Sequence, residues 1–305
     1  MSYSIETIQQ TPDYEGQVVT TIISKKAEEP TQKAVLYVHG FIDYFFQDHM
    51  ADAFTSSGIN FYAIDLRKYG RSLLPHQHPN YCRYITEYFE DIDRAIEQIT
   101  ADGNNQLALL GHSTGGLITS LYAAKGTYAA KIDVLVLNSP FFEFNVSPFS
   151  KFALLVVSSI LKPFPYLSLK GLLSPLYAQS VHKDFKGEWD FNLDWKPIEG
   201  FPSYYRWMNA IWRGHQQVQK GLLLQCPVLV MHAQRSSKPK EWNDDIQQTD
   251  TVLNVKHIKK YGKRLGKSVS FFEVPNGMHD LTLARKQVRE MVLSYMTSWI
   301  GEKLR

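Results

Sequence analysis

A single serine stands between glycines in the segment Leu107-Ala-Leu-Leu-Gly-His-Ser-Thr-Gly-Gly-Leu117. Residues Gly111 to Gly115 fit the pattern G-x-S-x-G, after a run typical of a buried strand and before the apolar segment 117–124, which is typical of a helix. In a sharp strand-to-helix turn, side chains two positions either side of the serine would collide, so glycine is needed at both. The segment therefore predicts that Ser113 is a nucleophile at a helix N-terminus, with a plain helix cap as the alternative.

A serine hydroxyl needs a general base within hydrogen-bond reach, and ten histidines compete for that role. We predict His279, because it follows the last expected strand, 269–274, in a short loop. Open α/β sheets place their sites at the carboxyl ends of strands. His112 is next to the serine, but sequence neighbours at such a turn point apart, so we expect it to lie beneath the turn.

The base in turn needs an orienting carboxylate. The expected strand 228–231 is followed by a turn without an acid, and several acids come later. We predict Asp250, which comes directly before an expected helix and gives the chain order serine, acid, histidine. Asp244 and Asp245 remain open as the orienting acid, and Asp250 could instead be an N-cap for that helix.

Acyl transfer through a serine also needs N–H donors for the oxyanion. One predicted donor is the backbone N–H of Thr114, the residue after the nucleophile. The second is the N–H of Phe41, in the loop after the expected strand 34–38. Gly40 would let that backbone turn toward the serine, although His39-Gly40 could also be a plain turn.

Alternating strands and helices are expected to position these residues. Residues 3–8 and 18–23 flank a turn and predict an antiparallel hairpin. Helical spacing recurs over 88–99 and 288–299. Short apolar runs typical of strands buried on both faces cover 34–38, 61–64, 107–110, 134–137, 228–231 and 269–274. The fold class is therefore α/β, with a mostly parallel, doubly wound sheet.

One long segment interrupts this alternation. Residues 141–225 contain no clear strand and hold four of the six tryptophans. Because a structureless loop of that length is improbable, we expect an inserted, mainly helical cap there. Residues 1–140 and 226–305 would then form the core. The cap's aromatic residues favour an apolar substrate pocket, although they could equally form the cap's own core.

The composition is that of an ordinary globular protein. The 305 residues carry a net charge of +3, which gives no reason to expect a nucleic-acid partner. The N-terminus lacks a signal-peptide pattern, and the longest apolar stretch, 152–161, is too short to cross a bilayer. With only Cys82 and Cys226, we expect a cytoplasmic protein without stable membrane insertion, and neither a metal nor another cofactor.

Several motifs together resemble the α/β-hydrolase superfamily, and within it the lysophospholipase, monoacylglycerol lipase and serine aminopeptidase group. The resemblance implies an α/β-hydrolase fold and a Ser-His-acid triad that acts without a cofactor. In such relatives the acid follows the strand-end His232 by about four residues, which is Ser236 here, so Asp250 looks displaced by an insertion. The matching segments are Val38-His-Gly-Phe41, residues 61–72, Gly111-His-Ser-Thr-Gly-Gly116, Pro227-Val-Leu-Val-Met-His232 and Gly277-Met-His-Asp280.

The preferred hypothesis is a serine hydrolase that cleaves carboxylic esters through an acyl-enzyme on Ser113, of the lysophospholipase, monoacylglycerol lipase or carboxylesterase type. Its partner would be a small ester with an apolar acyl chain, and the protein would be a monomer or homodimer. One alternative is an aminopeptidase or amidase, which needs acids in the cap to bind an amine. Another is a non-catalytic binding protein on the same fold. The available cap acids are Glu143, Glu188, Asp190 and Asp194.

Overall fold

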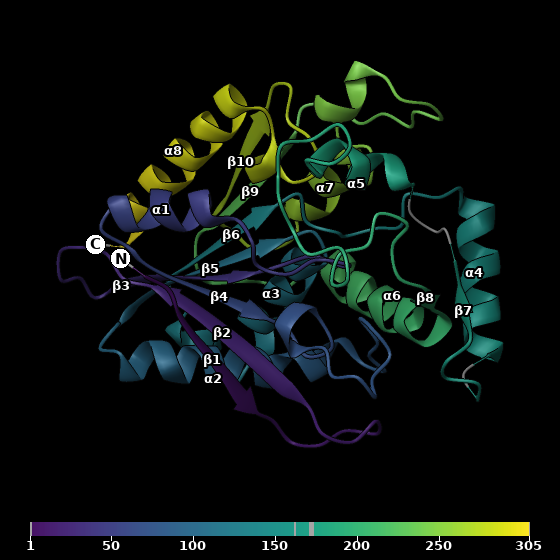
Figure 1. Cartoon of the computed structure of the whole chain (residues 1–305), viewed down its shortest axis with the longest axis horizontal. Helices are drawn as coiled ribbons and strands as arrows, with labels where there is room; N and C mark the ends of the chain where they lie inside the picture. Colours follow the sequence, from purple (N-terminus) through teal and green to yellow (C-terminus); the bar gives the residue numbers. More distant parts are fainter. Residues whose placement is uncertain (1, 162, 171–173, 305) are drawn as a thin grey trace.

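The computed structural model describes residues 2–161, 163–170 and 174–304. Within these residues, an eight-stranded sheet runs through the centre of the molecule (Figure 1). In spatial order its strands are β1 (Ser4–Gln9), β2 (Val19–Lys25), β4 (Asn60–Asp65), β3 (Lys33–Val38), β5 (Gln106–His112), β6 (Val134–Asn138), β9 (Val228–Ala233) and β10 (Val269–Val274).

The sheet is mostly parallel, as predicted. Strands β1 and β2 form an antiparallel hairpin, and β2 is also antiparallel to β4. From β4 to β10 every neighbouring pair is parallel. The carboxyl ends of β3, β5, β9 and β10 therefore lie at the same edge of the sheet, where the loops that carry the predicted site residues begin.

Helices cover both faces of the sheet because the buried strands are apolar on both sides. In β3, Leu36 belongs to the hydrophobic cluster beneath α2, α3 and α7, whereas Tyr37 belongs to the cluster beneath α1 and α8. This two-sided cover is the predicted doubly wound arrangement. The helices are α1 (Asp48–Ser56), α2 (Phe89–Ala101), α3 (Thr114–Lys125), α7 (Val255–Gly262) and α8 (Lys286–Lys303), with short 3₁₀ turns at Gly70–Ser72, Ile85–Tyr88, Ala129–Lys131, Asp244–Gln247 and Leu281–Leu283.

In its described part, the chain between β6 and β9 contains helices, two short strands and long irregular stretches, and it lies beyond the carboxyl ends of the central strands (Figure 1). Its two short strands pair only with each other in the described part of the chain. Helix α6 shares a hydrophobic cluster with α3, and its Gly214 lies directly against Leu117 and Leu121 of that helix. The elements of the segment between β6 and β9 are α4 (Pro148–Ile160), β7 (Ser168–Leu169), α5 (Pro175–Val181), β8 (Ser203–Tyr204) and α6 (Tyr205–Lys220).

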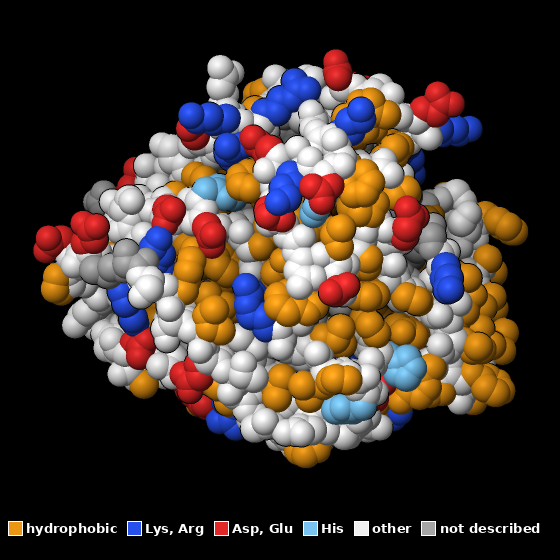
Figure 2. Space-filling view, viewed as in Figure 1, with side chains coloured by type: hydrophobic (Ala, Val, Ile, Leu, Met, Phe, Trp, Pro, Cys, Tyr) orange, Lys and Arg blue, Asp and Glu red, His pale blue; other side chains and the backbone are white. Residues whose placement is uncertain are grey.

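Helix α4 begins with a serine cap and a proline: the Ser147 hydroxyl accepts from the Ser150 N–H, and Pro148 takes the first helical position. Its outer face carries exposed apolar side chains, including Phe149, Phe152 and Ile160. Hydrophobic side chains gather at this end of the molecule in Figure 2. Even so, none of the helices described in the structure combines the length and the apolar character that a bilayer crossing requires.

Candidate active site

Ser113 occupies the turn between β5 and α3 with an unusual backbone, φ 50° and ψ −115°. Its N–H donates to the Asn138 carbonyl at 3.0 Å, and its own carbonyl accepts from the Phe141 N–H at 2.9 Å. A Cβ on Gly111 would collide with Thr119 Oγ1, and one on Gly115 would collide with the carbonyl oxygens of residues 38 and 39. The two glycines are therefore required by close packing around the turn, as the sequence indicated.

Three side chains from different parts of the chain meet at this turn. His279 Nε2 lies 3.0 Å from Ser113 Oγ, and His279 Nδ1 lies 3.0 Å from Asp250 Oδ2. Because the carboxylate can only accept, Nδ1 carries the hydrogen, which leaves Nε2 to accept from the serine hydroxyl. All three residues are buried. This is the geometry in which an imidazole removes the proton from a serine nucleophile.

Asp250 is held by backbone contacts in addition to His279. Its Oδ1 accepts from the N–H groups of Val252 and Leu253, at 2.9 and 2.7 Å. It also forms a β-bridge with Ser236, the position where the resemblance places the acid. Residues 237–249 therefore form a loop between the paired residues Ser236 and Asp250. This pairing places the Asp250 carboxylate after β9, within hydrogen-bond distance of His279. The N-cap of α7 is Asn254 rather than Asp250.

The other two candidate acids lie elsewhere. Asp244 and Asp245 belong to the 3₁₀ turn within the looped-out segment, and Asp245 pairs with Arg235 at the surface at 2.7 Å. Neither forms a hydrogen bond with His279 in the described part of the chain, whereas Asp250 does. Among the three acids left open by the sequence, the geometry therefore singles out Asp250.

The residues that carry the two predicted oxyanion donors lie close to Ser113. Thr114 is the first residue of α3, where backbone N–H groups have no partner inside the helix. Gly40 approaches so closely that a Cβ on it would lie 3.2 Å from Ser113 Cβ. Phe41 and Thr114 both line the same cavity as Ser113 and His279. This placement suits two N–H donors on either side of a substrate oxygen.

That cavity has a volume of about 370 Å³ and is lined by both the core and the segment between β6 and β9. Its walls are largely apolar, as in a site for an aliphatic or aromatic ligand. None of the four cap acids proposed for an amine-binding site is among the lining residues. Apolar side chains of the lining include Phe144, Val146, Leu154, Leu176, Ile198, Trp207, Val252 and Leu253.

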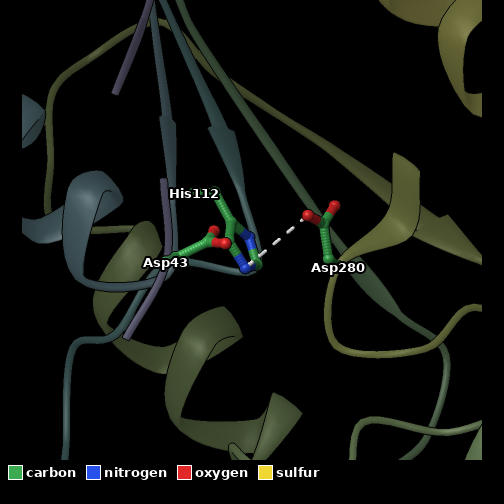
Figure 3. A group of neighbouring side chains, drawn as sticks. All are labelled: Asp43, His112 and Asp280. Carbon is green, nitrogen blue, oxygen red and sulfur yellow. Dashed lines mark ion pairs between the residues drawn. The ribbon is translucent and has the colours of Figure 1, made fainter. Parts of the chain in front are cut away.

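A buried charged cluster lies behind Ser113 and His279, and sequence reasoning missed it. Asp43, His112 and Asp280 bring ligand-type atoms within 4.8 Å of one another (Figure 3). Lys196, from the segment between β6 and β9, places its ammonium 2.6 Å from Asp43, so the chain itself supplies a cation here. The sequence gave no signal for this cluster, because Lys196 and Asp43 are 153 residues apart.

Within this cluster, the two residues that adjoin Ser113 and His279 are firmly held. His112 is buried beneath the turn, with Nδ1 3.1 Å from the Asn138 carbonyl. Asp280 Oδ1 accepts from Asn138 Nδ2, from the Thr282 N–H and from its hydroxyl. Burial by itself would raise the pKa of Asp280, but neighbouring His112 and these hydrogen bonds outweigh it and hold the pKa below its usual value. Asp280 is therefore a charged anchor for the loop that carries His279.

Known proteins share this architecture. Over 276 residues, 88% of each chain, the sequence is 25% identical to a monoacylglycerol lipase of Mycolicibacterium smegmatis. A soluble variant of monoglyceride lipase from Saccharomyces cerevisiae is similar with a TM-score of 0.69 at 18% identity, over 98% of this chain and 97% of that one. A carboxyl esterase from Bacillus coagulans gives 0.68 at 16% identity, over 99% of each. These likenesses confirm the α/β-hydrolase fold.

The family follows from a sequence match that covers the sheet from β3 to β10 and the segment between β6 and β9. The profile of a family described as serine aminopeptidase, S33, matches residues 29–283, which is most of the chain. The protein therefore belongs to the serine aminopeptidase, S33, family of α/β-hydrolases.

Proposed function

We propose that this protein is a serine hydrolase that cleaves carboxylic esters of apolar acyl chains through an acyl-enzyme on Ser113. The observation that carries the proposal is the hydrogen-bonded series Ser113–His279–Asp250, with both contacts at 3.0 Å, at the wall of an apolar cavity. Neither a metal nor an organic cofactor has a role in this chemistry. The residues that act are all supplied by the chain.

In the proposed mechanism, Ser113 Oγ attacks the ester carbonyl while His279 Nε2 takes the hydroxyl proton. The negative charge that develops on the carbonyl oxygen is stabilised by the N–H groups of Phe41 and Thr114. Asp250 keeps the hydrogen on Nδ1 and balances the imidazolium charge. His279 then gives its proton to the leaving alcohol oxygen, and a water activated by the same nitrogen hydrolyses the acyl-enzyme.

The apolar lining of the cavity supports the proposal that the substrate is an ester with an apolar acyl chain. Burial of each methylene in such a site contributes about 0.8 kcal/mol, so chain length is expected to matter. The relative from M. smegmatis is named a monoacylglycerol lipase, and we take that substrate class as the first candidate for this chain. Lysophospholipids and simple carboxylic esters are the other members of the proposed class.

The test combines a covalent probe with a substrate panel. We expect a fluorophosphonate probe to label Ser113, and p-nitrophenyl esters of increasing chain length to be hydrolysed with rising kcat/KM until the cavity is filled. Ser113→Ala should abolish both. Ser120→Ala is the matched control, because among the described residues the Ser120 hydroxyl bonds only to the Gly116 carbonyl within α3. Full ester turnover by Ser113→Ala would refute the proposal, and an unlabelled wild type would favour the non-catalytic binding protein.

An aminopeptidase or amidase remains the second candidate, since the family description names that activity. A free amine would need an unpaired acid in the cavity. Asp43 and Glu199 are the acids among the described lining residues, and Asp43 is already paired with Lys196. Glu199 is exposed and is the residue to test. Turnover of aminoacyl-naphthylamides above that of esters, lost in Glu199→Gln, would favour this candidate over the ester hydrolase.

The remaining assignments are proposals of the same kind. We propose a core of residues 1–140 and 226–305 with residues 141–225 as its cap, which fits the position of α4, α5 and α6 over the cavity. We also propose a cytoplasmic monomer or homodimer. Both cysteines, Cys82 and Cys226, are free, which suits a reducing compartment. Size-exclusion chromatography with light scattering tests the oligomeric state.

A further inference from the structure

The loop that carries Phe41 has a strained backbone. Ile42 has φ 52°, in the left-handed region, which is unfavourable for a β-branched residue. Such strain persists only where surrounding contacts over-determine the conformation. Gly40, the residue before Phe41, faces Ser113 directly. The contacts that hold this loop therefore also hold the proposed oxyanion donor.

Each of three consecutive loop residues is held by a residue of the segment between β6 and β9. The Phe41 ring stacks on Trp207 with ring centroids 4.0 Å apart. Ile42 meets Gly200, where a Cβ would lie 3.1 Å from Ile42 Cδ1. Asp43 pairs with Lys196 at 2.6 Å. The first two contacts are non-directional packing, whereas the third joins two fixed charges.

The Asp43–Lys196 pair is almost completely buried, with side-chain exposures of 3% and 9%. The Asp43 carboxylate also connects Lys196 with the loop backbone. Its Oδ1 accepts from Lys196, and its Oδ2 accepts a long, 3.5 Å hydrogen bond from the Gly40 N–H. On its other side Asp43 faces His112 and Asp280 (Figure 3). Without the ammonium, Asp43 would share this buried space with a second carboxylate, and repulsion would push it and its loop away.

We propose that Lys196 is a positioning residue for the oxyanion hole: its ion pair with Asp43 holds the Phe41 N–H beside Ser113. The inference rests on the proposed function, because it concerns the acyl-transfer step at that site. A donor that is misplaced by a fraction of an ångström stabilises the transition state less while substrate binding in the apolar cavity is retained. Loss of Lys196 should therefore lower kcat and leave KM nearly unchanged.

The first test is Lys196→Met assayed with p-nitrophenyl butyrate. We expect kcat to fall about 10- to 100-fold, less than the roughly 100- to 1000-fold loss on outright removal of an oxyanion-hole donor. KM should stay within about 3-fold. Labelling of Ser113 by a fluorophosphonate should slow in parallel, since phosphonylation also places negative charge in the oxyanion hole. Lys183→Met, which breaks the exposed Lys183–Asp190 pair of the same segment, is the matched control and should keep the wild-type kcat.

Two further variants separate positioning from simple charge balance. Lys196→Met leaves a buried, uncompensated carboxylate that can lower stability by itself. The double variant Asp43→Asn with Lys196→Met removes that charge, so we expect its thermal midpoint to return toward the wild type while kcat stays low. Lys196→Arg retains a cation and should keep most of the wild-type kcat.

The outcomes are distinct. A wild-type kcat in Lys196→Met, a change in KM alone, or a double variant with wild-type kcat would each overturn the positioning role while the serine hydrolase stands. A wild-type enzyme that neither hydrolyses esters nor reacts with the probe would refute the proposed function, and this inference with it. A poorly folded Lys196→Met leaves the decision to the double variant, which carries no unbalanced charge.

Discussion

At the scale of the residue, Ser113 shows how the fold prepares a hydroxyl for attack. Its left-handed backbone, with φ 50°, costs about 1–3 kcal/mol and must be enforced by its surroundings. The hydrogen bonds from Ser113 to Asn138 and from Phe141 to Ser113 enforce it. The hydroxyl is thus oriented before any substrate arrives, and so little reorganisation is needed at the moment of reaction.

Asp250→Asn is expected to lower kcat by a factor on the order of 10⁴, because the amide nitrogen would donate to His279 Nδ1 and force the hydrogen onto Nε2. The fold should survive, since the retained amide oxygen can still accept from the N–H groups of Val252 and Leu253. Ester kinetics and thermal denaturation measured together check both statements. Asp245→Asn breaks only a surface pair and is the control. An Asp250→Asn enzyme with near wild-type kcat would remove Asp250 from the proposed mechanism.

The residues of the site differ in how well they could be predicted from the sequence. Ser113 lies in a local pattern whose glycines are required by contacts within the turn, so it could be predicted from a few neighbours. His279 could be placed because it follows a strand at the carboxyl edge of the sheet. Lys196 could not, since nothing near it in sequence specifies a partner 153 residues away. Such a long-range charge pair depends on how the segment between β6 and β9 packs against the loop after β3.

At the scale of the element, the strands were the most predictable part. Every apolar run used for the sheet became a strand of it, because strands buried on both faces need unbroken apolar sequence. The run 269–274 differs from the prediction in its burial, since β10 is the edge strand of the sheet and is only partly buried. The sequence predicted an insertion before Asp250. It did not predict the β-bridge between Ser236 and Asp250 that closes the loop 237–249, because that bridge depends on backbone pairing. The two-residue strands β7 and β8 had no sequence signal, since so short a pair has no periodicity.

Helix α6 carries a buried histidine that makes stability depend on pH. His215 packs against the rings of Phe141 and Phe144, at 4.6 and 4.9 Å between centroids. Burial lowers the pKa of His215 to about 3. In the unfolded chain a histidine has a pKa of about 6.5. Below that pH the unfolded chain therefore binds a proton that the folded chain does not, and the free energy of unfolding decreases as the pH falls. This residue should remove about 2 kcal/mol of stability between pH 7 and pH 5.

Urea unfolding of the wild type and of His215→Phe at these two pH values measures the effect. Phenylalanine has a similar shape and binds no proton, so the variant should lose about 2 kcal/mol less than the wild type on acidification. His76→Gln, at an exposed histidine, controls for the other groups that titrate in this range. Equal losses in wild type and His215→Phe would show that His215 is not the source of the pH dependence.

At the scale of the whole molecule, contacts around one buried lysine link three distant parts of the chain. Lys68, fully buried, pairs with Asp13 at 2.7 Å and Glu15 at 2.6 Å, in the turn between β1 and β2. Glu15 also bonds to His78 at 2.6 Å, and His78 stacks on Tyr166 of the segment between β6 and β9. An ionic cluster thus connects the hairpin with the loop after β4, and the ring stack of His78 on Tyr166 connects that loop with the segment between β6 and β9. The apolar pattern of the sequence gives no indication of either contact.

Lys68→Met is therefore expected to destabilise the protein by about 3–5 kcal/mol, because it leaves Asp13 and Glu15 as buried carboxylates without their cation. The hydrophobic cores beneath the helices are untouched, so folded Lys68→Met should still label with the fluorophosphonate at Ser113. Urea unfolding monitored by circular dichroism gives the loss, and Lys183→Met, at an exposed ion pair, should change stability by only about 0–1 kcal/mol. If Lys68→Met lost no more than this control, the cluster would contribute little to stability. The attachment of the hairpin would then depend on its strand pairing with β4 and on hydrogen bonds such as those from Tyr14 to Glu87 and from Thr11 to Glu90.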